Sequence, residues 1–347
     1  MSIIKKIDKK DLGKLLEEWK QNFKLLTPSL QSGIADFTEW DGKDTSFTDW
    51  YRNTVIPPKR ILLPLVENMF SYSKGNEGYR LETPPLDENK QLVFGIRPCD
   101  AKAFSLLDMT FKKDYQDTYY LNHRQNTLLV GLSCNDPYAS CFCTSLDSSP
   151  SDASGVDIML TDIKYGWLVE SVTAAGEELI QNTENLEEAS EEDRTEAESN
   201  KQSALQKISR HIDTKDISEK LHKSFDDEAF WQQISAKCIS CGICTLLCPT
   251  CYCFDINDEV TVEGGSRYRS PDSCAFSVYT KMPVENPRSD KWKRVRNRVC
   301  HKYQVYPMLF DEIACTGCGR CIRLCPVNWD ITQTLESLPS SEVKDAK

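Results

Sequence analysis

Two cysteine motifs in the last third of the sequence have the residue types and spacing that bind iron–sulfur clusters. Each follows the pattern C-x2-C-x2-C-x3-C-P, with cysteines at Cys238, Cys241, Cys244 and Cys248 and again at Cys315, Cys318, Cys321 and Cys325. This spacing is typical of [4Fe-4S] clusters, and where two clusters occur the fourth cysteine of each motif binds the other cluster. We therefore expect one cluster on Cys238, Cys241, Cys244 and Cys325, and a second on Cys315, Cys318, Cys321 and Cys248.

Zinc is the competing metal, because C-x2-C pairs also bind zinc. A zinc ribbon uses two such pairs, however, and leaves the third cysteine and the Cys-Pro of each motif without a role. Inert buried cysteines would require no fixed spacing at all. Gly242, Gly317 and Gly319 let the backbone come close to a cluster, where its N–H groups can donate hydrogen bonds to the cluster sulfurs.

Four further cysteines lie in the first half of the chain, at Cys99, Cys134, Cys141 and Cys143. Cys99 and Cys134 each follow an apolar run that predicts a strand, and binding sites in α/β sheets lie in such post-strand loops. The four residues predict either a third [4Fe-4S] cluster or a set of buried free thiols, and spacing alone does not separate these alternatives.

The long segment between the two motifs holds the remaining cysteines, Cys251, Cys253, Cys274 and Cys300. They either pack beside the clusters or bind metal themselves. A basic run, 288–302, lies in the same segment. We expect its cations to face the clusters or the acidic part of the chain, with docking to an acidic redox partner or to nucleic acid as the alternatives.

The N-terminal part contains the elements that would position Cys99 and Cys134. Short apolar runs predict buried strands at 92–96, 128–132, 158–160 and 167–169, while the apolar spacing over 4–19 predicts a helix. Segments 101–111 and 203–233 also have helical patterns. The acidic stretch 171–200 predicts a solvated helix or linker, with a docking surface for a basic partner as the alternative.

These elements predict an α+β chain in four parts. We expect an N-terminal α/β domain at 1–170, an acidic and mostly helical connector at 171–233, a bacterial-type dicluster ferredoxin domain with a long insert at 234–336, and a disordered tail at 337–347. The chain has 347 residues, 16 of them cysteines, and a net charge of −11. The acidity argues against a nucleic-acid binder. The cysteine content without a signal peptide predicts a reducing, cytoplasmic setting, and no stretch is long and apolar enough for direct membrane insertion.

Beyond the two motifs, the sequence resembles a family of iron–sulfur beta subunits. The matching stretches are VIPPKR (55–60), FGIRPCDAKAFSLLD (94–108), GLSCNDPYASCFC (131–143), CISCGICTLLCPTCYCFDI (238–256), PDSCAF (271–276), RVRNRVCHK (294–302) and CTGCGRCIRLCP (315–326). They are similar to the beta subunits of cytoplasmic NAD(P)-linked hydrogenases and sulfhydrogenases, to the corresponding iron–sulfur subunit of anaerobic sulfite reductase, and to that of flavin oxidoreductases that supply heterodisulfide reductase.

This resemblance implies a subunit that relays single electrons between a flavin/NAD(P)-binding subunit and a catalytic subunit of the hydrogenase, sulfite reductase or heterodisulfide reductase type. It also favours the third cluster, since Cys99, Cys134, Cys141 and Cys143 lie inside matching stretches. No catalytic residues are expected, because clusters accept electrons without proton chemistry. The alternative is a self-contained iron–sulfur oxidoreductase with its own flavin or substrate site in the N-terminal domain.

Overall fold

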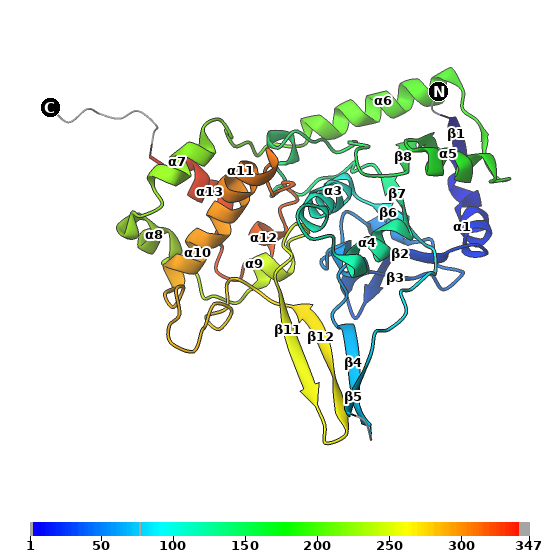
Figure 1. Cartoon of the computed structure of the whole chain (residues 1–347). Helices are drawn as coiled ribbons and strands as arrows, with labels where there is room; N and C mark the ends of the chain where they lie inside the picture. Colours follow the sequence, from blue (N-terminus) through cyan, green and yellow to red (C-terminus); the bar gives the residue numbers. More distant parts are fainter. Residues whose placement is uncertain (1–2, 76–77, 340–347) are drawn as a thin grey trace.

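The computed structural model describes residues 3–75 and 78–339, so the expected tail lies outside the described residues from position 340 onward. An eight-stranded mixed sheet forms the N-terminal half, in the order β10-β1-β9-β8-β7-β6-β2-β3 (Figure 1). Its strands are β1 (Ile4–Asp8), β2 (Lys24–Gln31), β3 (Ile34–Glu39), β6 (Gln91–Ile96), β7 (Thr127–Leu132), β8 (Ile158–Ile163), β9 (Gly166–Ser171) and β10 (Glu187–Glu188).

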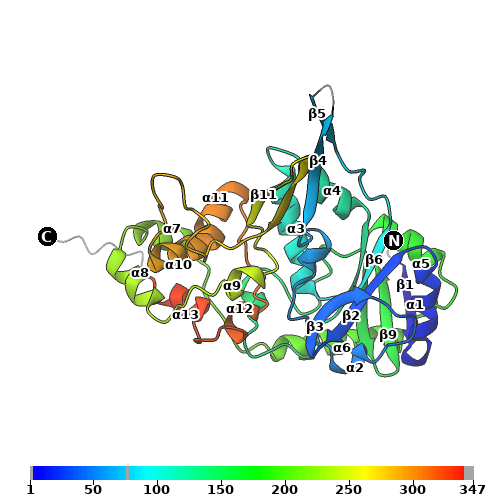
Figure 2. The same ribbon diagram turned by 90° about the horizontal axis from the view of Figure 1, so that it is seen from below.

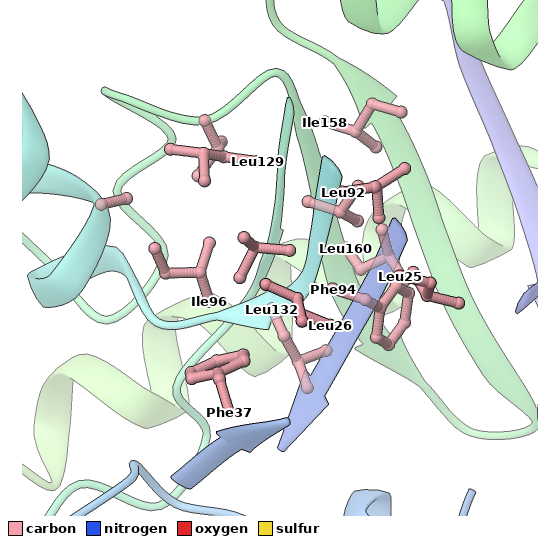
Figure 3. Packing of buried hydrophobic residues seen from close by; sticks show 14 of the residues in the cluster. Leu25, Leu26, Phe37, Leu92, Phe94, Ile96, Leu129, Leu132, Ile158 and Leu160 are labelled. Atoms are coloured by element: carbon pink, nitrogen blue, oxygen red, sulfur yellow. The ribbon is translucent and has the colours of Figure 1, made fainter. Parts of the chain in front are cut away.

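The strands predicted from apolar runs form the centre of this sheet. β2, β6, β7 and β8 run parallel to one another, while β1, β3, β9 and β10 pair antiparallel at the two sides. Parallel strands covered on both faces have continuous apolar sequences, which explains why these runs were recognisable. Side chains such as Leu92, Phe94, Leu129 and Leu160 meet in the core of this half (Figure 3).

The predicted helix over residues 4–19 is wrong in its first half. Residues Ile4–Asp8 form β1, which pairs with β9, and the helix α1 is confined to Leu12–Lys20. The apolar residues in this stretch belong to two different elements. Ile7 is a buried residue of β1, while Leu15 and Leu16 are buried residues of α1. The strand depends on a partner far along the sequence, which local spacing does not reveal.

Helices cover the sheet and extend into the acidic segment. They are α2 (Phe47–Trp50), α3 (Pro98–Lys112), α4 (Thr118–Gln125), α5 (Ala174–Gln181) and α6 (Glu191–Gln206), of which α6 runs along one side of the molecule (Figure 1). Part of the acidic stretch forms α6, whose buried residues are Ala197 and Ala204. Residues 171–233 are nevertheless not a free connector, since β10 pairs with β1 in the sheet.

A second, four-stranded sheet joins the insert to the N-terminal half. Its order is β11-β12-β4-β5, with β4 (Glu67–Gly75), β5 (Gly78–Glu82), β11 (Phe254–Val260) and β12 (Gly264–Pro271). β12 pairs antiparallel with β4. The insert is therefore structurally part of both halves, and this sheet projects from the body of the molecule (Figures 1 and 2).

The C-terminal half is a group of short helices around a second core. They are α7 (Ile217–Lys223), α8 (Glu228–Ser235), α9 (Ile243–Leu246), α10 (Lys291–Cys300), α11 (Tyr306–Phe310), α12 (Arg320–Arg323) and α13 (Ile331–Glu336), with a π-helical turn at His301–Val305 (Figure 2). The predicted helix over 203–233 is thus divided among α6, α7 and α8. Trp231, Val299 and Tyr303 are buried in this core, together with Phe142 from the N-terminal half.

Across the described residues, no helix has the length and apolar character needed to cross a membrane.

Candidate iron–sulfur sites

The first cysteine group surrounds a cavity at the beginning of α9. Cys238, Cys241 and Cys244 line it from the first motif, and Cys325 lines it from the end of the second motif. Gly242, just before α9, has a φ of 77°. This left-handed conformation favours glycine and lets the chain turn sharply between Cys241 and Cys244. The structure thus brings together the four cysteines that the crossed spacing predicts for one cluster.

Backbone and side-chain donors point into this first group. Ser240 donates its backbone N–H to Cys238 Sγ at 3.4 Å, and Trp329 donates its backbone N–H to Cys325 Sγ at 3.2 Å. Arg298 lines the same cavity and donates from Nη2 to the carbonyl oxygen of Cys244 at 2.9 Å. Such donors stabilise negative charge on the sulfurs.

Arg298 is the positive charge best placed to offset an anionic cluster. Burial alone would lower the pKa of Arg298, but the sulfurs of Cys244 and Cys321 raise it well above its usual value. Its Nη1 atom is buried and has no hydrogen-bond partner among the described residues. A buried guanidinium with a free donor requires a compensating acceptor or negative charge. The residues of this cavity therefore fit an anionic [4Fe-4S] cluster.

The second group gathers around the segment where the two motifs cross. Cys248 and Cys318 are buried, and burial raises the pKa of Cys321, with the nearby sulfurs of Cys315, Cys248 and Cys318 raising it further. The hydroxyl of Thr250 lies 3.2 Å from Cys248 Sγ and donates to the carbonyl oxygen of Ala314 at 2.8 Å. Cys248 is therefore held beside the start of the second motif.

Lys302 supplies the buried positive charge of this second group. Its Nζ donates to Thr250 Oγ1 at 2.7 Å and to the carbonyl oxygen of Ala314 at 2.8 Å. A hydrogen bond from the Cys251 thiol lowers the pKa of the Cys248 thiol well below its usual value, and the charges of Lys302 and Arg298 lower it further against the effect of burial. These contacts favour a thiolate at Cys248, which is the form that binds metal.

The third group lies where β6 and β7 end. Because these parallel strands are neighbours, the loops after them meet, and Cys99, Cys134, Cys141 and Cys143 all line one cavity. Arg97 lines it too and donates from Nη1 to the carbonyl oxygen of Leu132 at 3.1 Å, which joins the two strand ends. The segments after the two strands therefore form a single site, but the expectation that Cys99 lies in a loop is wrong, because it is in the first turn of α3.

The surroundings of the third group contain unused hydrogen-bond donors. Burial raises the pKa of Cys141 and of Cys143 to about 12, which disfavours bare thiolates there. The hydroxyls of Ser140, Thr144 and Thr316 are buried and lack hydrogen-bond partners within the described ranges. Buried hydroxyls without partners among the described residues, at positions beside Cys141, Cys143 and Gly317 in the sequence, leave room for an acceptor such as a cluster sulfur.

The second and third groups are in direct contact. Phe142 donates its backbone N–H to the carbonyl oxygen of Gly317 at 2.9 Å, and the Cys141 thiol donates to the carbonyl oxygen of Cys318 at 3.7 Å. A Cβ on Gly317 would lie 2.5 Å from the backbone nitrogen of Cys143. The second motif therefore links the groups, because its Gly317 and Cys318 contact the third group and its Cys325 lines the cavity of the first.

The basic run contains the charged residues that surround the first two groups. Arg294, Arg298 and Lys302 are buried, and they lie four residues apart on one helical face. This confirms the expectation that cations of this run face the cysteine motifs. Their i, i+4, i+8 spacing was a signal in the sequence, although it did not show which cysteine each would meet.

The cysteines of the first and third groups line cavities. All sixteen are free thiols. In the part of the chain that the structure describes, no three His, Cys, Asp or Glu side chains are close enough together to hold one metal ion.

Comparisons with known proteins find one family model and one relative that match this chain. Residues 237–329 match the family model of a 4Fe-4S dicluster domain. The chain is similar to the beta subunit of sulfhydrogenase 2 from Pyrococcus furiosus, with 29% identity over 296 residues that cover 83% of this chain and 84% of that protein. No solved structure matches the chain. The similarity extends well beyond the dicluster domain and includes the N-terminal half.

Proposed function

We propose that this chain, a homologue of a sulfhydrogenase beta subunit with a 4Fe-4S dicluster domain, is the electron-transfer subunit of a multi-subunit oxidoreductase. Its partners would be a flavin/NAD(P)-binding subunit and a catalytic subunit of the hydrogenase, sulfite reductase or heterodisulfide reductase type. The cytoplasm is the proposed compartment, because cysteines that bind clusters must remain reduced.

Three groups of cysteines are the proposed ligands. Cys238, Cys241, Cys244 and Cys325 would hold one [4Fe-4S] cluster, Cys315, Cys318, Cys321 and Cys248 a second, and Cys99, Cys134, Cys141 and Cys143 a third. When bound, such clusters accept and release one electron at a time. The chain's own residues bind them, exclude water and set the local charge through Arg298, Lys302 and Arg97.

The observation that carries the proposal is the first cavity. Four cysteines from two distant segments line it, and Arg298 is buried against it with an Nη1 that lacks a partner among the described residues. A [4Fe-4S] cluster would add sulfide acceptors for this free donor and would gain a further negative charge on reduction, which a buried guanidinium stabilises.

The test is to purify the full chain without oxygen and to measure its iron and acid-labile sulfide. Three clusters predict about twelve of each per chain, and two predict about eight. Stepwise reduction followed by electron paramagnetic resonance should show separate signals of reduced clusters. Clusters that stay silent across the protein range of about −700 to +450 mV would instead indicate a purely structural role.

A second measurement separates the relay from a self-contained enzyme. The purified chain is mixed with NADH or NADPH, and the visible absorbance of the clusters is followed before and after a flavin subunit is added. The relay predicts bleaching only when the flavin subunit is present. Bound flavin in the purified chain, or bleaching by the chain alone, would overturn it.

A further inference from the structure

Four cysteines of the insert are outside the three groups, and two of them, Cys251 and Cys253, line one cavity. Cys300 is buried in the C-terminal core, and burial raises its pKa to about 12. Cys251 contacts Cys248 of the second group through a hydrogen bond between their thiols. Cys253 and Cys274 remain, and they are paired with each other.

The ends of β11 and β12 bring Cys253 and Cys274 together. Phe254 lies opposite Pro271 at the last register position, and Asp272 donates its backbone N–H to the carbonyl oxygen of Cys253 at 2.9 Å. After β12 the chain contacts the first cysteine motif, because the hydroxyl of Ser273 forms a hydrogen bond with the hydroxyl of Thr245. This contact places the Cys274 thiol within hydrogen-bonding contact of Cys253.

The two thiols differ in access and in acidity. Cys253 lines a cavity of about 240 Å³, whereas Cys274 is 6% exposed and does not line it. Hydrogen bonds from the Cys274 thiol and the Tyr279 hydroxyl, aided by the charge of Lys59, lower the pKa of Cys253 to about 6 despite its burial. One accessible thiolate beside one buried thiol is the arrangement found in dithiols that carry out thiol–disulfide exchange.

We propose that Cys253 and Cys274 form a redox-active dithiol that reacts with small disulfides entering this cavity. The Cys253 thiolate attacks one sulfur of the external disulfide, the S–S bond of that molecule breaks, and the first half leaves as a thiolate. Cys274 then gives its proton to this leaving thiolate and attacks the sulfur of Cys253, which expels the second half. The protein loses two electrons in forming the Cys253–Cys274 disulfide, and the external disulfide gains them as one thiol and one thiolate.

The cavity also indicates which small disulfides would react. Lys59 and Arg60 line it together with Leu63 and Leu65. Lys59 is buried, and the hydrogen bond from its Nζ to the carbonyl oxygen of Cys251 (2.7 Å) fixes its position without a carboxylate. Three basic residues, Lys59, Arg60 and Arg269, line this cavity against one acid, Asp272, so the lining favours a disulfide that carries carboxylate groups on short carbon chains.

The test uses the full chain, purified without oxygen, and two small disulfides of similar size and opposite charge. The protein is incubated with dithiodipropionate or with cystamine, the remaining thiols are blocked with N-ethylmaleimide, and the peptides are mapped by mass spectrometry. We expect Cys253 and Cys274 to lose their maleimide labels together and to appear as one cross-linked peptide. Dithiodipropionate should react at least several-fold faster than cystamine.

Variants identify the order of attack without relying on activity. Cys274→Ser should stop the reaction at the mixed disulfide, with one half of the reagent retained on Cys253. Cys253→Ser should abolish the reaction at both positions, and Cys300→Ser should leave it unchanged. Iron content should be the same in all of these proteins.

Two results would overturn the inference. One is the absence of a cross-linked peptide in the unaltered chain at any concentration of either disulfide, which needs no variant to observe. The other is the loss of about four irons per chain in Cys253→Ser or Cys274→Ser, which would make these residues cluster ligands.

Discussion

The guanidinium of Arg320 and the carboxylate of Asp100 form a completely buried, two-pronged ion pair, with Nη1–Oδ1 at 2.6 Å and Nη2–Oδ2 at 2.8 Å. Asp100 follows Cys99 in the first turn of α3, and Arg320 precedes Cys321 in α12. Arg320 also donates from Nε to the carbonyl oxygen of Thr54 at 2.8 Å. One pair of charges thus joins the second and third cysteine groups.

Removing one charge of this pair should destabilise the folded protein. Asp100→Asn keeps the shape of the side chain but leaves Arg320 buried without its partner, so we expect the free energy of unfolding to fall by about 3–5 kcal/mol. Glu188→Gln, which removes the exposed partner of Lys5, should cost less than about 1 kcal/mol. Denaturant unfolding followed by circular dichroism measures both, and equal losses would contradict the assigned role of Asp100.

The crossed assignment of Cys248 can be tested by comparing two serine variants. Cys248→Ser should remove the resonance signal of the cluster on Cys315, Cys318 and Cys321, with a loss of up to about four irons per chain. Cys241→Ser should remove a different signal. If both variants lose the same signal, the assignment is wrong. Cys300→Ser serves as the control and should retain all of the iron.

Gly317 should tolerate no side chain. Its φ is 63°, and a Cβ would lie within 2.7 Å of the backbone atoms of Phe142 and Cys143. Gly317→Ala should therefore separate the second and third groups and lower the iron content. Gly33 is the matched control, since its φ is 80° but a Cβ added there would have no atom within 4 Å. Gly33→Ala should cost about 1–2 kcal/mol and leave the iron unchanged; equal iron loss in both would contradict the steric argument.

Arg298 should make the first cluster easier to reduce. Removing its positive charge in Arg298→Met leaves the added electron less stabilised, so the reduction potential of that cluster should fall by tens of millivolts. Arg296→Met removes the same charge from the same helix, but Arg296 contacts the ring and carbonyl of Phe225 instead of the cavity. A redox titration should show little change for Arg296→Met, and equal shifts would rule out a local effect of Arg298.

The alkylation of Cys253 should depend on pH in the range set by its neighbours. Thiolates are the reactive form, and the pKa of Cys253 is lowered to about 6 by Cys274, Tyr279 and Lys59. The rate of reaction with iodoacetamide should rise through pH 6 and level off above about pH 7, whereas the rate for an ordinary thiol has its midpoint near pH 8.5 and continues to rise above it. Tyr279→Phe should move this midpoint upward. A midpoint near 8.5 in the unaltered chain would show that the thiolate is not stabilised.

The sequence predicted the elements whose signals are local. The apolar runs that became β6 and β7 were recognisable because buried parallel strands are apolar throughout, and Cys99 and Cys134 follow them, Cys99 in the first turn of α3 and Cys134 in a loop. β1 was mistaken for part of a helix, since its partner β9 lies far along the chain. The pairing of Arg320 with Asp100 was not predictable for the same reason, because neither residue carries a local sign of the other.

The pairing of β12 with β4 has a consequence for how the chain is made. Arg269 of β12 and Glu67 of β4 form a buried ion pair, although they are 202 residues apart. At a synthesis rate of about 5–20 residues per second, β4 leaves the ribosome about 10–40 s before its partner strand exists. Throughout that interval β4 has an unpaired edge next to β5, which is the kind of surface that mispairs with other chains. Newly made chains are therefore most vulnerable to aggregation before residue 271 has been added.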